Sequence, residues 1–461
     1  MGTVRFVNRE RELEALEGWW AGDHRLGLVW GRRRVGKTAL INHFVAGKRV
    51  VFHTSVGRPP VEELAVLSRA AAAVVAQPVR DLTRRPFLDW DDALETLEAA
   101  AAGRPLLLVL DEFPELVATT PELPRVLRAF LESARTAPGL RLLLCGSAVR
   151  TMEAIQRERA PLYGRLDLAL LVHPFAPHEA ALMLGDLAPA DRALVWGVLG
   201  GVPLYLQWWD QAAPVAENLG RLAATPGGRL LIEGQMVLAT EVESGDLAGR
   251  VLRAVAAGRT RHHEIADRIR ADPTRTLERL VELRILERVV PVTEDPRRTR
   301  RRRYRIADNF LAFFLGVVDR YRTEIERGLG PQVLGVLTEH LDDHMGPCWE
   351  EAFRAHLRRM AAAGELGDRV MAVGPFWTEG GDSVEIDAVA LAGLAHQPVL
   401  VGEAKWAKRV DGRRLEADLA RKALRLPGSF APVRFAIAAR DRVDRASEQT
   451  LVLTATDLFS T

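Results

Sequence analysis

The sequence predicts a multidomain α/β protein, in which a parallel sheet covered by helices precedes a helical segment and a second, smaller α/β domain. Three observations support this class. A chain of 461 residues is too long for one ordinary domain. Short apolar runs alternate with helical segments over residues 1–170. Strand signals are scarce over residues 173–245 and return after residue 368.

The composition excludes several other classes of protein. The apolar fraction is 48% and the charged fraction 27%, which is ordinary for core-forming globular proteins and disfavours disorder, collagen and coiled coil. The net charge of +2 excludes a globally basic chain. Only Cys145 and Cys348 are present, so no disulfide framework is expected. With no apolar run of about 18 residues, the sequence predicts a cytoplasmic protein without membrane contact.

The first predicted domain, residues 1–172, reads as a parallel sheet with helices. Each strand is a short apolar run, and each helix has apolar residues on one face. The predicted strands are Leu26–Trp30, Val50–His53, Leu106–Leu110 and Leu140–Cys145, and the predicted helices are Glu10–Trp20, Thr38–Ala46, Val61–Ala76 and Trp90–Ala102.

A glycine-rich motif follows the first strand and opens a helix. Gly31–Thr38 has the pattern G-x4-G-K-[ST], in which glycines let backbone N–H groups curl around an anion. The helix N-terminus adds partial positive charge, Lys37 reaches the β- and γ-phosphates, and Thr38 holds Mg²⁺. The predicted nucleotide-binding residues here are Gly31, Arg32, Arg33, Arg34, Val35, Gly36, Lys37, Thr38 and Ala39.

Two carboxylates end another apolar strand. We expect Asp111 to bind Mg²⁺ through water and Glu112 to orient and deprotonate the attacking water, with Lys37 as its catalytic partner. The alternative is a solvated strand end before a turn at Pro114. Ser147 follows a further strand, where it either senses the γ-phosphate or is simply a small turn residue.

These motifs resemble the prokaryotic archaeal-type ATPases, on the STAND and AAA+ side of the P-loop class. The matching segments are Val7–Glu10, Gly31–Thr38, Leu110–Glu112, Gly146-Ser147 and Tyr163–Arg165. The resemblance implies that Asn8 and Arg9 lie near the nucleotide base. It also makes Arg165 a candidate arginine finger or sensor, unless it pairs with a surface carboxylate. Gly201-Val202-Pro203 resembles the Gly-x-Pro element that touches adenine, which adds Pro203 to the predicted nucleotide site.

Residues 173–245 are predicted to form a helical lid, and residues 246–310 resemble a winged helix-turn-helix. Seven arginines lie within Arg297–Arg305, after a turn near Asp295-Pro296, and suit a DNA backbone. The alternatives are a solvated edge strand or a contact for an acidic protein. The predicted helices are Ala248–Ala257, His263–Ile269 and Pro273–Arg288, and the first strand of the hairpin is Val289–Val292.

After a helical connector at 311–345, residues 346–461 carry a second constellation. A helix at Trp349–Ala361 precedes predicted strands at 369–373, 384–391, 399–405 and 433–438. Glu403 and Lys405 are two apart on a strand and share a face. Converging carboxylates repel unless a divalent cation joins them, so Asp387 and Glu403 are predicted Mg²⁺ ligands.

The order of these groups resembles the PD-(D/E)XK, restriction-endonuclease-like superfamily. The resemblance makes Glu350, Asp387, Glu403 and Lys405 the predicted catalytic residues, although Glu351 competes with Glu350 as the helical acid. Archaeal-type ATPases often carry such a C-terminal domain. A separate group, His340, His344 and Cys348, offers a zinc alternative just before it.

Two functional hypotheses follow. The first is an ATP- and Mg²⁺-dependent ATPase coupled to a DNA-binding winged helix and a nuclease-like domain that cleaves DNA, with ATP and DNA as partners and a homo-oligomer as one arrangement. The second is a nucleotide-dependent switch or scaffold whose nuclease-like domain is inactive and only binds nucleic acid or protein.

Overall fold

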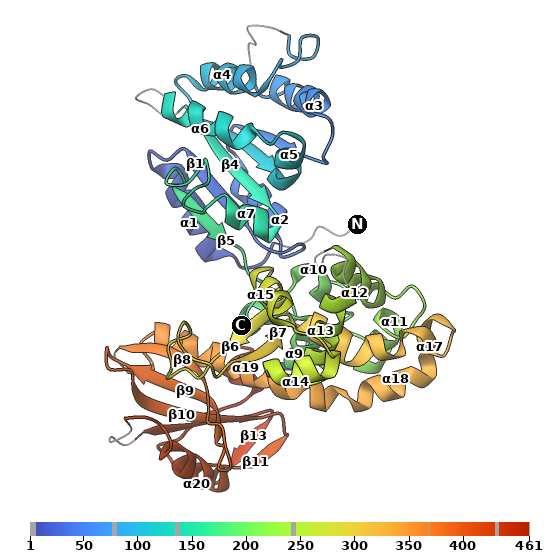
Figure 1. Ribbon diagram of the computed structural model, residues 1–461, viewed down its shortest axis with the longest axis vertical. Helices are drawn as coiled ribbons and strands as arrows, with labels where there is room; N and C mark the ends of the chain where they lie inside the picture. The colour runs from blue at the N-terminus through green and yellow to red at the C-terminus, as the bar shows by residue number, and fades with distance from the viewer. Residues whose placement is uncertain are drawn as a thin grey trace. The chain divides into compact units, whose positions relative to one another are not determined.

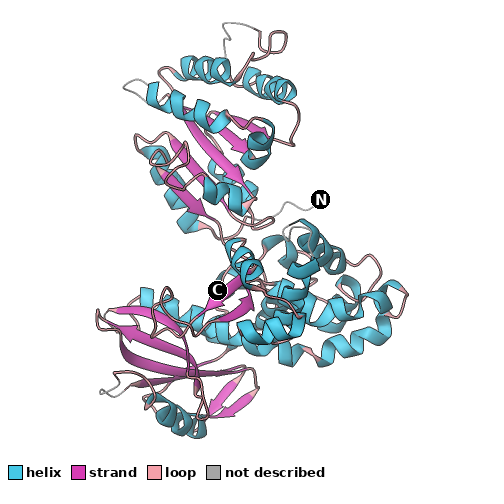
Figure 2. Cartoon of the chain, viewed as in Figure 1, coloured by secondary structure: helices cyan, strands magenta, loops and turns pink. Residues whose placement is uncertain are grey.

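The computed structural model describes residues 6–75, 81–133, 139–240, 246–367, 369–428 and 433–460. The chain divides into two compact units, Met1–Pro174 and Phe175–Thr461. Figures 1 and 2 show an α/β unit, then a helical region, then a β-rich region, and the predicted fold class is confirmed. The finer division of residues 175–461 stays a prediction.

The first unit is built on a five-stranded sheet in the order β2-β3-β4-β1-β5, in which every neighbouring pair is parallel. Four of these strands match the predicted ones to within one residue at each end. The fifth was missed because its residues are only half-buried and carry a weak apolar signal. The strands are β1 (Leu26–Trp30), β2 (Val50–Thr54), β3 (Leu106–Asp111), β4 (Leu140–Gly146) and β5 (Leu168–Leu171).

Helices cover both faces of this sheet because alternate residues of each strand point to opposite sides. Leu106 and Leu108 pack toward α3–α7, whereas Leu107 and Val109 pack toward α1 and α2. Ala76, the predicted last residue of the third helix, lies outside the described residues. The helices are α1 (Glu10–Ala21), α2 (Lys37–Phe44), α3 (Pro60–Ala72), α4 (Trp90–Ala101), α5 (Phe113–Thr119), α6 (Leu123–Ser133) and α7 (Val149–Ala154).

The second unit begins with helices that share one apolar core with the rest of the unit. A π-helical segment, Phe314–Val318, and a 3-10 turn, Asp319–Tyr321, follow α16. The elements are α8 (Pro177–Ala181), α9 (Pro189–Leu199), α10 (Pro203–Leu206), α11 (Val215–Leu222), α12 (Arg229–Thr240), α13 (Asp246–Ala256), α14 (His262–Ile269), α15 (Thr274–Glu282), β6 (Leu286–Val289), β7 (Arg303–Ile306), α16 (Asn309–Phe313), α17 (Arg322–Glu326), α18 (Gly330–Glu339) and α19 (Leu341–Ala362).

The prediction for the basic hairpin was wrong in its boundaries. The third helix was expected to reach Arg288, but α15 ends at Glu282, and Arg284 takes a left-handed φ of 56° that breaks the helix. Strand β6 therefore begins at Leu286, and it pairs antiparallel with β7. The first hairpin strand, expected at Val289–Val292, lies three residues earlier.

The C-terminal region is a mixed sheet in the order β14-β12-β10-β9-β8, with β10, β12 and β14 parallel and β8 and β9 antiparallel to their neighbours. Apolar residues of α19 pack on one face, and those of α20 pack on the other. The elements are β8 (Val370–Trp377), β9 (Glu385–Ala392), β10 (Gln397–Lys405), β11 (Arg409–Asp411), α20 (Gly412–Ala423), β12 (Arg434–Ala439), β13 (Arg442–Asp444), β14 (Leu451–Leu453) and α21 (Ala455–Leu458).

Helix α19 is longer than the predicted Trp349–Ala361, because it continues through Pro347 back to Leu341. Proline in a helix interior removes one hydrogen bond and usually ends the helix, which explains the later predicted start. No helix among the described residues is both long and apolar enough to cross a bilayer.

Candidate functional site

The glycine-rich motif forms a tight loop between β1 and α2. Gly31 has a φ of 150°, and a Cβ there would meet the Val172 carbonyl oxygen at 2.4 Å, so only glycine fits. Gly36, at the start of α2, has a φ of 94°, and Arg34 has a left-handed φ of 68°. This backbone curl turns successive N–H groups inward, which is the conformation that an anion-binding nest requires.

The lysine and threonine of the motif face the end of β3. The Lys37 ammonium donates hydrogen bonds of 2.9 Å to the carbonyl oxygens of Gly31 and Arg32, within the loop that would receive the phosphates. The Thr38 hydroxyl lies 3.4 Å from Oδ2 of Asp111. The carboxyl ends of β1, β3 and β4 share one sheet edge, because β4 lies between β1 and β3.

This pair of oxygens suits a magnesium ion. Hydroxyl and carboxylate oxygens are the hard donors that Mg²⁺ takes alongside substrate phosphates. Asp111 is 96% buried but ends next to the loop, and its Oδ1 accepts the Glu112 backbone N–H at 3.0 Å. Thr38 and Asp111 would therefore hold the ion, which neutralises phosphate charge when it is bound.

The second carboxylate of the strand end is held by its neighbour. Glu112 adopts a left-handed φ of 50°, and such strained non-glycine residues cluster at functional sites. The Ser147 hydroxyl donates to the Glu112 carboxylate at 3.0 Å. Cys145, which sequence reasoning missed, lies on adjacent β4. Burial and the nearby Asp111 raise the pKa of its thiol. Its place at the end of a central strand was the available signal.

The remaining predicted nucleotide residues are arranged less uniformly. Arg9 is buried, and its guanidinium donates at 2.8 Å to the carbonyl oxygens of Val35 and His173, so it braces the loop from behind. Asn8 precedes it with a left-handed φ of 59°. Arg165 is exposed and pairs with Glu132 at 2.8 Å, which is the surface pairing left open by the sequence.

The other positions of the motif differ in exposure. Val35 is fully buried under the loop, Arg33 and Ala39 are exposed, and Arg32 and Arg34 are intermediate. Pro203 opens α10 in the second compact unit.

The C-terminal acids converge on one corner of the second sheet. Asp387 on β9 and Glu403 on β10 are both more than 90% buried. The Lys405 ammonium lies 2.6 Å from Glu403 Oε1 and 3.8 Å from Asp387 Oδ2, and the Ala404 N–H donates to Asp387 at 2.8 Å. Glu350 on α19 interacts electrostatically with Lys405.

The electrostatics of this corner disfavour the ionised form of two of its carboxyl groups. Burial, followed by the charges of Glu350 and Glu403, raises the pKa of Asp387 to about 7. Burial also raises the pKa of Glu350. A nearby cation stabilises the ionised form of such a carboxyl group.

Two basic side chains of this cluster were not predicted from the sequence. Lys422 on α20 donates to Glu403 Oε2 at 2.9 Å, and Arg354 on α19 donates to the Asp387 carbonyl oxygen at 2.8 Å. A signal for Lys422 existed, because the chain has only five lysines among its 63 Lys and Arg residues. Lysines thus cover both oxygens of Glu403. Across the described ranges, no group of three His, Cys, Asp or Glu residues could hold a metal ion. The carboxylates of Asp387 and Glu403 are suitable magnesium ligands, but the two lysines already neutralise Glu403.

The two candidate helical acids share Arg354 but differ in their other charged neighbours. Although burial opposes it, Arg305, Arg354 and Arg358 lower the pKa of Glu351 to about 2. Glu351 Oε2 lies 3.0 Å from both Arg305 Nη1 and Arg354 Nε. Glu350 also pairs with Arg354, at 3.6 Å, and in addition interacts electrostatically with Lys405 of the carboxylate corner. Glu351 is instead paired with three arginines.

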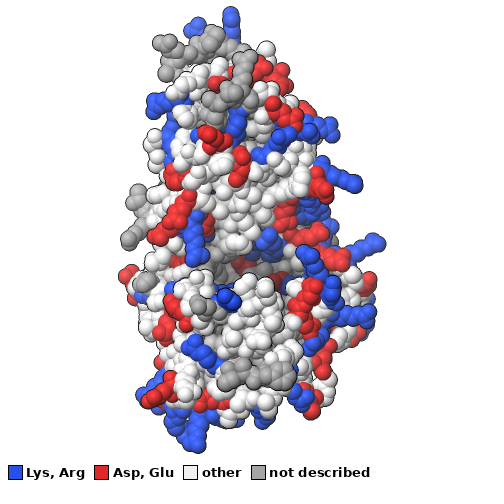
Figure 3. Space-filling view, turned by 90° about the vertical axis from the view of Figure 1, so that its left-hand side faces the viewer, with Lys and Arg blue, Asp and Glu red and all other residues white. Residues whose placement is uncertain are grey.

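Three arginines of the run, Arg301, Arg303 and Arg305, form ion pairs within the chain. Arg303 pairs with Glu385 at 2.6 Å, Arg301 pairs with Glu294 and donates to the Trp377 carbonyl oxygen, and Arg305 pairs with Glu287 and Glu351. These three guanidinium groups already have partners within the chain, and contact between the hairpin and DNA stays a prediction. Figure 3 shows acidic and basic side chains interspersed on the face in view.

Comparisons with known proteins bear on both units. Residues 6–208 match a family described as an ATPase domain predominantly from Archaea, and residues 314–418 match a family of archaeal and bacterial proteins of unknown function. An uncharacterized protein of Methanocaldococcus jannaschii is 25% identical over 428 residues, which cover 90% of this chain and 91% of that relative. An uncharacterized ATP-binding protein of the same organism is 50% identical over 50 residues, or 11% of this chain and 85% of that relative.

A solved structure supports the fold. The Walker-type ATPase of Pyrococcus abyssi aligns with a TM-score of 0.51 at 20% identity, covering 67% of this chain and 96% of that chain.

Proposed function

We propose that this chain is a Mg²⁺-dependent ATPase whose nucleotide state controls a nuclease-like C-terminal domain that acts on DNA, because residues 6–208 match the family described as an ATPase domain predominantly from Archaea. The observation that carries the ATPase part is the meeting of three groups at one sheet edge. The Lys37 ammonium lies inside the loop, and the Thr38 hydroxyl lies 3.4 Å from Asp111.

Each residue of this edge has a distinct task. The loop N–H groups and Lys37 bind the phosphates, and Thr38 with Asp111 holds the cation. Glu112 is oriented by Ser147 and accepts the proton of the attacking water. Arg9 holds the loop in shape from its buried side.

The ATPase proposal is tested by titrating the purified chain with ATP and MgCl₂ in a calorimeter and by measuring phosphate release. We expect saturable binding and phosphate release that EDTA abolishes. The absence of heat and saturation at millimolar ATP would refute the proposal.

The C-terminal part of the proposal is supported by buried Asp387 and Glu403 with Lys405 between them. The geometry also favours a second candidate, a nucleotide-dependent switch or scaffold whose C-terminal domain only binds. The favouring observation is Lys422, which pairs with Glu403 at 2.9 Å and competes with any cation for that carboxylate.

A plasmid assay separates the two candidates. Supercoiled DNA is incubated with the chain, MgCl₂ or MnCl₂, and ATP, ADP or no nucleotide. Nicking by the natural chain, lost in Lys405→Ala and in Asp387→Asn, supports a nuclease. Intact plasmid under every condition, together with normal ATP turnover, supports the switch or scaffold.

A further inference from the structure

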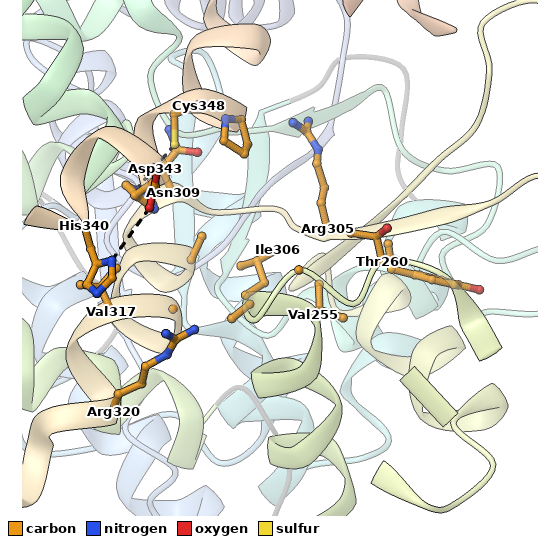
Figure 4. Close-up of a pocket in the computed structure, with 17 residues that line it drawn as sticks. Val255, Thr260, Arg305, Ile306, Asn309, Val317, Arg320, His340, Asp343 and Cys348 are labelled. Atoms are coloured by element: carbon orange, nitrogen blue, oxygen red, sulfur yellow. Dashed lines mark hydrogen bonds and ion pairs between the residues drawn. The ribbon is translucent and has the colours of Figure 1, made fainter. Parts of the chain in front are cut away.

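Within the second unit, a cavity of about 460 Å³ opens beside strand β7. Its walls come from α13, β7, the π-helical segment and the N-terminal half of α19 (Figure 4). Most of the lining is apolar, including Val255, Ile306 and Val317. Known small-molecule pockets have volumes of roughly 300–1,000 Å³ and a mainly apolar lining with a few polar groups.

Two helix irregularities line this cavity. Gly316 lies in the π-helical segment, and such segments recur at functional sites. Pro347 stands inside α19 and has no N–H, so it gives no hydrogen bond to the Asp343 carbonyl oxygen one turn earlier. Both residues line the pocket. A proline inside a helix costs about 3 kcal/mol, and costly irregularities of this kind are concentrated at functional sites.

The polar side chains that line the pocket lie on two opposite sides of it. Figure 4 shows His340 and Arg320 on one side of the pocket and Arg305 and Thr260 on the other. The His340 ring lies 4.0 Å from the Asp343 carboxylate. Within the part of the chain that the structure describes, Arg320 forms no ion pair, so its charge is available to an incoming group.

The zinc alternative does not account for the pocket. His344 Nε2 is 2.8 Å from the Gly197 carbonyl oxygen and 3.6 Å from Cys348 Sγ, and no metal-holding group exists among the described residues. These side chains are buried in internal contacts and contribute to the wall.

We propose that this pocket binds a small organic anion, with a planar apolar body against Val255, Ile306 and Val317 and its negative group at Arg320. The pocket is independent of the ATPase and nuclease proposals. It shares α19 with Glu350 and Glu351, which lie two and three residues beyond Cys348, and it shares Arg305 with the ion pair to Glu351.

The test uses two fluorescent probes that differ in charge. The anionic probe is 8-anilino-1-naphthalenesulfonate, and the neutral probe is N-phenyl-1-naphthylamine. We expect saturable 1:1 binding of both probes by the full chain. Gly316→Leu should weaken both at least tenfold, because its backbone φ accepts a side chain and that side chain fills the cavity. Arg320→Gln should weaken only the anionic probe, about fivefold.

Matched controls are available on the same helical region. Gly335→Leu and Arg327→Gln alter exposed residues outside the pocket and should leave both affinities unchanged. Unchanged near-ultraviolet circular dichroism confirms that each variant is folded. The proposal is overturned if the natural chain shows no saturable binding, or if folded Gly316→Leu binds both probes as the natural chain does. If Arg320→Gln weakens both probes equally or neither, the anion assignment is refuted.

Discussion

The Ser147 hydroxyl donates a hydrogen bond of 3.0 Å to the Glu112 carboxylate across the ends of two adjacent strands. The Ser147 backbone N–H also faces this carboxylate, at 3.4 Å. Glu112 has a left-handed backbone and immediately precedes α5, and this contact holds its side chain toward β4. A γ-phosphate sensor and a catalytic base would therefore be coupled before nucleotide arrives.

Removing the Glu112 carboxylate should separate binding from turnover. We expect Glu112→Gln to bind ATP within threefold of the natural affinity and to lose phosphate release by about 100-fold or more, because only the proton acceptor is lost. Ser147→Ala should lower kcat by about tenfold, since the carboxylate remains but is less well oriented. Steady-state phosphate release and calorimetry measure both. If Glu112→Gln released phosphate as fast as the natural chain, Glu112 would not be the proton acceptor.

Lysine substitution tests the loop. Lys37→Ala should weaken ATP binding by about 100-fold, or ~2.7 kcal/mol, because a charge-assisted contact to phosphate is lost. Lys48 is the matched control, because it is the other lysine of the first unit and pairs with Glu17 at 2.7 Å. Lys48→Ala should bind ATP normally. Similar losses in both variants would point to a general effect on the fold.

The two neighbouring acids of α19 should differ in their contribution to stability. Glu351→Gln leaves Arg305, Arg354 and Arg358 without their shared carboxylate, and we expect a loss of about 3 kcal/mol in the free energy of unfolding. Glu350→Gln should change it by less than about 1 kcal/mol, because burial already disfavours the ionised form of Glu350. Urea denaturation measures both losses. A larger loss in Glu350→Gln than in Glu351→Gln would show that Glu350, and not Glu351, is the acid that holds the arginines.

The arginines of the β6–β7 hairpin fall into two classes. Neutralising Arg297, Arg298, Arg300 and Arg302 together to glutamine should weaken DNA binding and reduce the slope of log K against log salt by up to about 3–4. Arg303→Gln removes its ion pair with Glu385 and should leave that slope nearly unchanged. Fluorescence anisotropy over a salt series measures the slopes. An unchanged slope in the quadruple variant would exclude the hairpin from DNA contact.

We expect the free energy of unfolding to decrease as the pH falls, because protonation of the buried His356 destabilises the folded state. Burial, followed by the charge of Arg359, lowers the pKa of His356 to about 4 from its ordinary 6.5. The folded state thus favours the neutral ring. Its contribution is fully present above pH 6.5 and is lost progressively as the pH falls to 4, by up to about 3 kcal/mol. His356→Gln should flatten this decline in urea denaturation between pH 7 and 4. An identical decline would assign it to other groups.

The first unit was predictable because its signals are local. Buried parallel strands are continuous apolar runs, and the glycine motif specifies its own loop, so β1 and α2 follow from adjacent residues. Asp111 was found because it ends such a strand. Strand β5 was missed because its half-buried residues carry no such run.

The second unit was harder because its decisive contacts are distant in sequence. Lys422 reaches Glu403 from a helix 19 residues later, and nothing in the local pattern of α20 indicates this. The arginines of the β6–β7 hairpin resemble a nucleic-acid surface in sequence, but the acidic partners of Arg303 and Arg305 come from β6, β9 and α19. Charge runs alone do not reveal which carboxylates already neutralise them.

Helix α19 also determines how the protein can be dissected. A fragment starting at residue 346, where the sequence predicts a domain boundary, would begin in the middle of that helix and would discard the packing of Leu341 and Met345. It would also leave Glu351 without Arg305. A shortened chain that keeps the C-terminal sheet intact must therefore start upstream of the β6–β7 hairpin, and the sheet cannot be excised as a separate module without repair of this helix.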